Sequence, residues 1–238
     1  MAELEYACVS EAHPVRVEGS TPSRGTLRQT KCKPNLTYMI TTVLFDIYGM
    51  IIDREMRFSK RFSNEFNVPM EKLLPFFENE FQLCLVGKAD LKEELQKYLS
   101  SWNWQGSVDE LLEYWFGHEG NIDQKIMASV KDLKNRGIKC FLNTQNDKYL
   151  VKYVLENIGL KDFFDGVFCT NEIGYKKPQQ EYWQTIYVQL GNPNKETVLC
   201  WDDEEKHITA AKEFGFSAEI YKNYTEYEEI INKYLNKN

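Results

Sequence analysis

The chain has 238 residues, and with 42% hydrophobic and 14% aromatic residues it can bury one sizeable core. Its formal net charge of -7 argues against general nucleic-acid binding, which requires a basic surface. No apolar run approaches the roughly 18 residues of a membrane span, and none of the six cysteines forms a CxxC pair, so neither a transmembrane helix nor the usual spacing of a zinc site is expected.

Three of the cysteines, Cys140, Cys169 and Cys200, each lie in an apolar run that is typical of a buried strand. A free buried cysteine behaves as a small hydrophobic residue, and this pattern fits a reducing cytoplasm better than a disulfide scaffold. We therefore expect a cytoplasmic protein that acts on a small molecule, as a monomer or homodimer, with no nucleic-acid and no membrane partner.

Residues 1–38 differ from the rest of the chain. They show no apolar period, they contain the polar, turn-rich stretch VEGSTPSRGT, and they lack the apolar region of a secretory signal. We interpret them as a disordered or extended leader, or as residues ahead of a true translation start at Met39. The alternative is an ordered arm that packs on the body of the protein.

Short apolar runs after Met39 predict a parallel sheet. The first is VLFDI at 43–47. Four further runs rich in Val, Leu, Phe or Cys follow at 139–143, 166–170, 197–201 and 217–221. Because helical patterns lie between these runs, we predict an α/β fold, a Rossmann-like parallel sheet sandwiched by helices, with the first strand at its centre.

The segment at 54–120 interrupts this alternation. It contains four helical stretches, at 58–66, 70–81, 90–99 and 108–116. Four helices exceed a normal crossover between two strands, so we predict an inserted helical lobe, with the core formed by 39–53 and 121–238. Its aromatic residues are expected to pack the interior of the lobe: Trp102, Trp104, Tyr114, Trp115 and Phe116.

A last helix is predicted from a capping box, in which Thr225 is followed three residues later by Glu228. The apolar residues that follow fall on one helical face. They are Tyr227, Ile230, Ile231 and Tyr234.

Polar side chains follow the predicted strands at their carboxyl ends, where open α/β sheets bind ligands. Asp46 follows the first strand and Thr144 the second, and Asp202 and Asp203 follow the fourth. Lys177 lies in a Gly-Tyr-Lys-Lys-Pro segment between the third and fourth strands. An aspartate can act as a covalent nucleophile, clustered carboxylates can bind Mg²⁺, and a hydroxyl and an ammonium can hold phosphoryl oxygens.

The segments that carry these residues resemble, in order and spacing, the four motifs of the haloacid dehalogenase superfamily of hydrolases. They are VLFDIYGMIID, CFLNTQNDKY, NEIGYKKPQQEYW and VLCWDDEEKHITAAKEFGF, and the match runs over about residues 41–222. The helical insertion at 54–120 resembles the helical cap of subfamily I, which closes over the site and selects substrates.

The resemblance implies a hydrolase with an aspartate nucleophile. Its catalytic residues are expected to be Asp46, Thr144 and Lys177. Its Mg²⁺ ligands are expected to be Asp46, Asp202, Asp203 and, through the backbone carbonyl, Tyr48.

Two residues depart from the family pattern. Most phosphatases of the family have an aspartate two residues after the nucleophile as general acid and base, and this chain has Tyr48 there. A phenol is a poor acid at neutral pH. The dehalogenase branch also has tyrosine at this place, but it works without metal and lacks the acidic pair that this chain keeps at Asp202 and Asp203. Met50 stands where threonine is usual.

Each residue also has an ordinary structural interpretation. Asp46 can cap a loop, Asp202 and Asp203 can cap the following helix, and one of Lys176 and Lys177 can be a solvated surface charge. The order of the four motifs favours the catalytic interpretation, and the position directly before proline favours Lys177.

Three functions therefore stay open. The first is Mg²⁺-dependent, phosphatase-type hydrolysis of a small phosphorylated metabolite. The second is dehalogenase-type hydrolysis at carbon, and the third is a degenerate binding protein that keeps the fold. Neither His118 nor His207 is given a catalytic role, because an isolated histidine is more often structural or exposed to solvent.

Overall fold

The computed structural model describes residues 39–53, 56–118 and 120–236, so the predicted leader at 1–38 lies outside the described residues. The described residues belong to one compact unit. Its parallel sheet and flanking helices confirm the predicted α/β fold.

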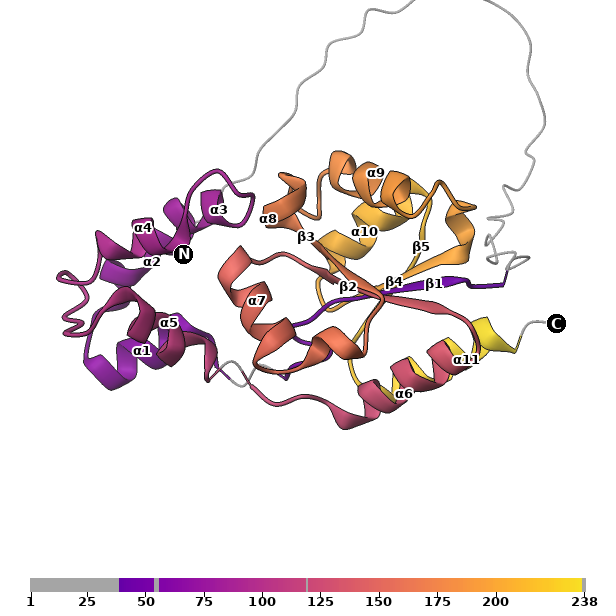
Figure 1. The fold of residues 1–238 in the computed structure, drawn as a ribbon, viewed down its shortest axis with the longest axis horizontal. Coiled ribbons are helices and arrows are strands. Elements are labelled where there is room, and N and C mark those ends of the chain that lie inside the picture. Colours follow the sequence, from indigo (N-terminus) through magenta and orange to yellow (C-terminus); the bar gives the residue numbers. More distant parts are fainter. Residues whose placement is uncertain (1–38, 54–55, 119, 237–238) are drawn as a thin grey trace, which may run out of the picture. The chain divides into compact units, whose positions relative to one another are not determined.

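Five parallel strands form one sheet in the order β3-β2-β1-β4-β5 (Figure 1). The strands are β1 (Thr42–Phe45), β2 (Lys139–Thr144), β3 (Gly166–Cys169), β4 (Val198–Asp202) and β5 (Ser217–Ile220). β1 lies at the centre, as predicted, but it ends two residues early. The backbone N–H groups of Ile51 and Ile52 both donate to the carbonyl of Ile47, so the chain leaves the sheet in a tight turn directly after Asp46.

Both faces of the sheet are buried, and β1 contributes to both. Leu44 packs with α9 (Gln180–Gln189) and α10 (Glu205–Phe214). Val43 and Phe45 belong to the cluster of the opposite face, which includes residues of three helices: α6 (Gln124–Asn135), α7 (Lys148–Glu156) and α11 (Tyr224–Leu235). Figure 1 shows α9 and α10 on one side of the strands and α6 and α11 on the other. The alternation explains why the strand sequence is apolar throughout.

Short elements complete the core. They are η1 (Leu160–Asp162), α8 (Thr170–Ile173) and η2 (Lys195–Thr197). Four cysteines of the described residues are free and buried: Cys84, Cys140, Cys169 and Cys200. The prediction that the cysteines in the strand runs are buried thiols is therefore confirmed.

In the described part of the chain, five helices lie between β1 and α6 in the sequence, and we call them the helical insertion. They are α1 (Phe58–Phe66), α2 (Met70–Glu78), α3 (Glu80–Cys84), α4 (Leu91–Gln96) and α5 (Val108–Phe116). The sequence predicted four, and the difference is a break at Asn79, whose φ of -116° and ψ of -84° separate α2 from α3. Trp102 and Trp115 are buried, and the Trp115 ring stacks on Phe58 with centroids 4.3 Å apart. Aromatic packing therefore holds these helices together.

The last helix begins with a different cap from the predicted one. The side chain of Asn223 accepts a hydrogen bond from the backbone N–H of Glu226, so Asn223 is the N-cap and Thr225 lies inside α11. Asparagine caps helices at least as well as threonine, and its position two residues earlier lengthens the helix. Of the four residues predicted on one face, Tyr227, Ile231 and Tyr234 are buried and Ile230 is partly buried against the core. Among the described residues, no helix has the length and apolar character needed to cross a bilayer.

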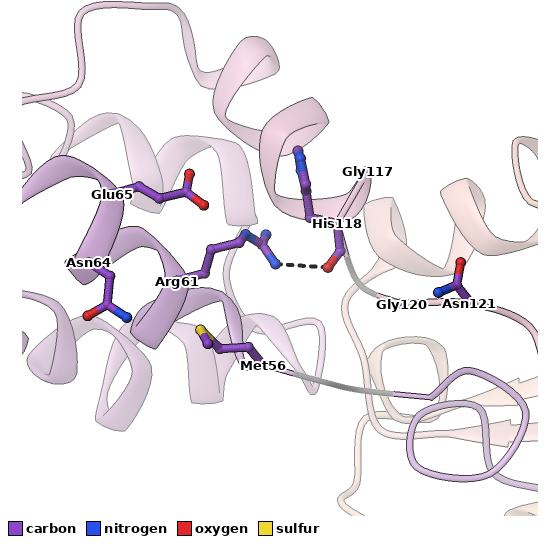
Figure 2. A pocket seen from close by; sticks show the side chains of 8 residues that line it. All are labelled: Met56, Arg61, Asn64, Glu65, Gly117, His118, Gly120 and Asn121. Atoms are coloured by element: carbon purple, nitrogen blue, oxygen red, sulfur yellow. Dashed lines mark hydrogen bonds between the residues drawn. The ribbon is translucent and has the colours of Figure 1, made fainter.

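Arg61 ties α1 to the end of α5. Its guanidinium donates to the carbonyl of His118 at 2.8 Å (Figure 2). It also donates to the carbonyls of Tyr114 and Trp115 at 3.4 and 3.1 Å. The last carbonyls of a helix have no partner within the helix, and a cation near them interacts favourably with the helix dipole.

Replacing Arg61 with methionine should therefore destabilise the protein, because the apolar stem is kept and the three donated bonds are lost. We expect the free energy of unfolding to fall by about 1–2 kcal/mol and the melting temperature by about 2–8 °C. Thermal unfolding followed by circular dichroism measures this. Lys60→Met, at the exposed neighbouring position of α1, is the matched control. Equal melting temperatures for the two variants would contradict the role of Arg61.

Candidate active site

The turn after β1 places Asp46 at the carboxyl edge of the sheet. The backbone N–H of Asp46 donates to the carbonyl of Trp201 at 3.0 Å, which continues the pairing between β1 and β4 by one residue. Gly49 has a φ of +88°, and a Cβ atom there would lie 2.2 Å from Oδ2 of Asp203. Only glycine fits this position, so the glycine of the first motif lets the turn lie against the acidic pair.

Lys177 lies between two of the carboxylates. Its ammonium nitrogen is 2.7 Å from Oδ1 of Asp46 and 2.7 Å from Oδ2 of Asp202, and its side chain is 1% exposed. Burial alone would lower the pKa of Lys177, but the carboxylates of Asp202 and Asp46 hold this pKa well above its ordinary value. Lys177 is therefore a fixed cation that serves both carboxylates.

The three aspartates form one cluster of oxygen atoms. Asp46, Asp202 and Asp203 each offer a carboxylate oxygen, and these oxygens lie within 4.8 Å of one another. Burial and the neighbouring carboxylates raise the pKa of Asp46, although Lys177 opposes this shift. Burial also acts to raise the pKa of Asp202, but Lys177 and His207 outweigh it and hold this pKa below its ordinary range. Burial and the Asp202 charge raise the pKa of Asp203.

This charge balance fits a divalent cation. Three carboxylates lie together, and the Lys177 ammonium contacts two of them, Asp46 and Asp202. Hard carboxylate oxygens are the donors that Mg²⁺ takes in proteins. The residues present therefore suit the metal that the sequence resemblance implies.

Thr144 is the last residue of β2, and it is 1% exposed. Because Leu142 pairs with Phe45, Thr144 lies at the same carboxyl edge as Asp46. Its hydroxyl oxygen accepts a hydrogen bond from Nδ2 of Asn146 at 2.5 Å, which leaves the hydroxyl proton available for another acceptor.

Tyr48 occupies the turn two residues beyond Asp46, and it is buried, with 6% exposure. The turn is closed by the hydrogen bond from the N–H of Gly49 to the carbonyl of Ile52 at 2.9 Å. Met50, the other departure from the family pattern, is also buried. The metal role of the Tyr48 carbonyl stays a prediction.

Sequence reasoning missed two residues that the structure places against the predicted ones. Nδ1 of His207 lies 2.9 Å from Oδ1 of Asp202, and Asn146 donates to Thr144. The available signal was spacing: His207 falls on the first turn of the helix that follows Asp202, and Asn146 lies two residues after Thr144.

The helical insertion contacts the core beside Lys177. The ammonium of Lys176 donates to Oε1 of Gln82 at 2.7 Å, and Nδ2 of Asn171 donates to the carbonyl of Cys84 at 2.6 Å. Gly87 approaches so closely that a Cβ atom there would lie 2.4 Å from the carbonyl oxygen of Asn171. The segment around α3 therefore lies directly against the loop that carries Lys177.

A second polar contact joins the insertion to α7. The hydroxyl of Tyr149 donates to Oδ2 of Asp90 at 2.8 Å, and the ammonium of Lys148 pairs with the same oxygen at 2.7 Å. Asp90 also caps α4 through its other oxygen. The start of α4 is thereby fixed to the helix that follows the second motif.

An open hollow of about 450 Å³ lies elsewhere, beside α1 and the end of α5 (Figure 2). Its lining includes Arg61, Glu65 and His118. It contains none of the residues predicted for catalysis or metal binding, so the candidate site is the carboxylate cluster and not this hollow.

Comparison with known proteins identifies the family. Residues 43–219 match the model of the haloacid dehalogenase-like hydrolases. The chain belongs to this family. The matched range contains all four predicted motifs, from the β1 turn to the acidic pair.

Curated relatives of this haloacid dehalogenase-like hydrolase carry phosphatase names. The chain is 32% identical over 91 residues to a glyceraldehyde 3-phosphate phosphatase of Methanocaldococcus jannaschii, an alignment that covers 37% of the chain and 39% of the relative. It is 24% identical to a ribulose-1,5-bisphosphate 5-phosphatase of Halopiger xanaduensis, over 45% of the chain and 46% of the relative. The chain thus spans less than half the length of these two relatives. A pyrophosphatase PpaX of Bacillus cereus is 24% identical, over 74% of the chain and 80% of the relative.

Solved structures share the fold. A family enzyme from Bacteroides thetaiotaomicron superposes with a TM-score of 0.72 at 17% identity, covering 82% of this chain and 99% of that one. A complex of the Bacteroides enzyme with magnesium and inorganic phosphate gives a TM-score of 0.66 at 20% identity, over 77% and 94% of the two chains. The L-2-haloacid dehalogenase of Xanthobacter autotrophicus gives 0.57 at 18% identity, over 84% of each chain.

Proposed function

We propose that this protein is a Mg²⁺-dependent phosphatase that acts on a small phosphorylated metabolite in the cytoplasm. The observation that carries the proposal is the position of Lys177, 2.7 Å from both Asp46 and Asp202, within a cluster of three carboxylates. A buried ammonium beside a nucleophilic carboxylate suits the transfer of a highly charged phosphoryl group. The phosphatase names of the curated relatives support the same class of reaction.

The proposed reaction has two steps, and Asp46 is the nucleophile in the first. A carboxylate oxygen of Asp46 attacks phosphorus, a new O–P bond forms, and the bond from phosphorus to the leaving oxygen breaks with its electron pair on that oxygen. In the second step water attacks the same phosphorus, the bond to Asp46 breaks, and the carboxylate and inorganic phosphate are released. Lys177 and the hydroxyl of Thr144 hold phosphoryl oxygens through both steps.

The cation site would be formed by the Asp46, Asp202 and Asp203 carboxylates, with the backbone carbonyl of Tyr48 as a further ligand. When bound, Mg²⁺ supplies positive charge that offsets the charge of the phosphoryl oxygens. Lys177 neutralises part of the carboxylate charge and keeps the nucleophile oriented.

The leaving oxygen must obtain a proton or depart as an anion. Tyr48 stands where an aspartate would supply that proton, and the ordinary pKa of a phenol, about 10, makes it a poor donor at neutral pH. Substrates with good leaving groups, such as acyl phosphates, aryl phosphates and phosphoanhydrides, should therefore be preferred.

We further propose that the core consists of 39–53 and 121–238 and that 54–120 is a helical cap that selects the substrate. The contacts of Gln82 and Cys84 with the core beside Lys177 support this division. Closing a helical segment over a site excludes water from it. The leader at 1–38 stays a prediction.

Removal of the metal tests the proposed function. We expect the purified chain to release inorganic phosphate from p-nitrophenyl phosphate and acetyl phosphate, to lose this activity in EDTA, and to regain it when Mg²⁺ is added. Chloride release from 2-chloropropionate is measured in parallel, with and without EDTA. Phosphate release that EDTA does not affect would contradict the metal role, and halide release without metal would favour hydrolysis at carbon.

A further inference from the structure

His207 contacts the carboxylate cluster of Asp46, Asp202 and Asp203 through Asp202. It lies in the first turn of α10 and is 3% exposed. Its Nδ1 is 2.9 Å from Oδ1 of Asp202. Because a carboxylate oxygen accepts hydrogen bonds, Nδ1 carries the proton and donates it. The imidazole therefore approaches Asp202 as a directed hydrogen-bond donor.

Three donors fix the Asp202 carboxylate. The backbone N–H of Glu204 donates to Oδ1 at 2.9 Å, and Lys177 donates to Oδ2 at 2.7 Å. Lys177 is shared with Asp46, so it does not hold Asp202 alone. Among the residues that the structure describes, His207 is the side-chain donor that serves Asp202 and not Asp46, and with the other two donors it restricts rotation of the carboxylate about its terminal bond.

The other ring nitrogen argues against a purely structural role. Nε2 of His207 is buried and has no hydrogen-bond partner within the described part of the chain, and the nearest carboxylate oxygen, on Glu204, is 3.9 Å away. An unsatisfied buried polar atom destabilises the folded state. An apolar side chain would avoid that cost, so the histidine is explained by what Nδ1 does to Asp202.

We propose that His207 is a positioning residue of the cation site. Its hydrogen bond holds the Asp202 carboxylate in the orientation in which it can bind a divalent cation beside Asp46 and Asp203. This inference rests on the proposed function, because it assigns His207 a role in the metal site of that reaction. Groups that hydrogen-bond to metal ligands generally orient them, and their loss weakens metal binding.

Metal binding to the full chain tests the inference without reference to catalysis. Mg²⁺ binding is measured by calorimetry and Mn²⁺ binding by electron paramagnetic resonance, since Mn²⁺ takes the same oxygen ligands. In His207→Leu we expect the dissociation constant of both ions to rise about 10- to 100-fold. His207→Asn keeps a side-chain N–H donor and should recover most of the lost affinity.

A matched control removes a hydrogen bond that lies away from the site. Ser129→Ala loses the contact with the hydroxyl of Tyr227, whose oxygen is 2.7 Å from the serine oxygen. This variant should keep the metal affinity of the wild type. A kinetic measurement complements it: in His207→Leu the Mg²⁺ concentration for half-maximal rate should rise, while kcat at saturating Mg²⁺ and the KM for p-nitrophenyl phosphate change little.

The outcomes separate this inference from the proposed function. If the wild type binds neither ion, the metal site itself is wrong. If the wild type binds and a folded His207→Leu binds equally well, the inference alone is overturned. His207→Met is the second apolar variant, because methionine adapts to buried spaces. If both apolar variants fail to fold while His207→Asn binds as the wild type does, His207 is required for folding and the inference is likewise overturned.

Discussion

Asp46→Asn should abolish hydrolysis, with kcat reduced by about 10⁶-fold, the scale on which loss of a covalent nucleophile acts in other hydrolases. The amide cannot form the acyl phosphate of the proposed mechanism, on which the second step depends. The asparagine oxygen can still accept the hydrogen bond that Lys177 donates to Oδ1. Removing one of three clustered negative charges also relieves repulsion, so the variant should fold. Phosphate release under single-turnover conditions measures the effect.

Asp165→Asn is the matched control for this change. Asp165 precedes β3, at the amino edge of the sheet, where its Oδ2 accepts a hydrogen bond from the backbone N–H of Cys140 at 2.8 Å. The same substitution there leaves the carboxyl edge untouched, and the rate should stay at the wild-type value. An Asp46→Asn preparation with undiminished hydrolysis would show that the activity belongs to a contaminant or to another site.

Tyr48→Asp should raise the turnover of phosphate esters, and alkyl phosphates should gain most. An alkoxide leaves poorly unless it is protonated, whereas an aryl oxide departs more readily unaided. General acid catalysis is typically worth about 100- to 10,000-fold, so even partial recovery should be measurable. The comparison of kcat for glycerol phosphate and p-nitrophenyl phosphate, with the same enzyme preparation, gives the selective gain directly.

Tyr48→Phe is the control for this second change, because it keeps the buried ring and adds no carboxyl group. It should leave the ratio of alkyl to aryl turnover unchanged. Thermal unfolding of both variants checks that the buried position tolerates the substitution. If Tyr48→Asp folds and the alkyl rate does not rise, position 48 does not face the leaving group. For hydrolysis at carbon the same change should bring no gain, because halide leaves unprotonated.

The sequence carried enough information to predict the sheet, because five apolar runs separated by helical patterns have few alternative arrangements. The ends of the elements were less predictable. β1 ends at Phe45 and not at Ile47, since the Ile47 carbonyl is used by the turn that follows. The helical stretch that begins at Met70 is broken at Asn79 by backbone angles that no composition rule specifies.

The contacts within the candidate site were even less predictable from the sequence than the ends of the elements. Position at strand ends was sufficient to select Asp46 and Asp202, because parallel strands end at one edge. It did not indicate that one ammonium, that of Lys177, contacts both carboxylates. Nor did it select His207. The role of a histidine depends on the atom that it contacts, and here that contact depends on the direction in which α10 leaves the sheet.

The buried cysteines have a practical consequence. Burial raises the pKa of Cys84 and Cys140 to about 12 and that of Cys169 to about 11, and it raises the pKa of Cys200 as well. Since the thiolate is the reactive form, alkylating reagents can modify these four side chains only when the surrounding strands and helices separate. The rate at which they are labelled then measures how often the native protein opens transiently, without denaturant. Because Cys84 belongs to the helical insertion and the other three to the sheet, the modified peptides would report on each region separately.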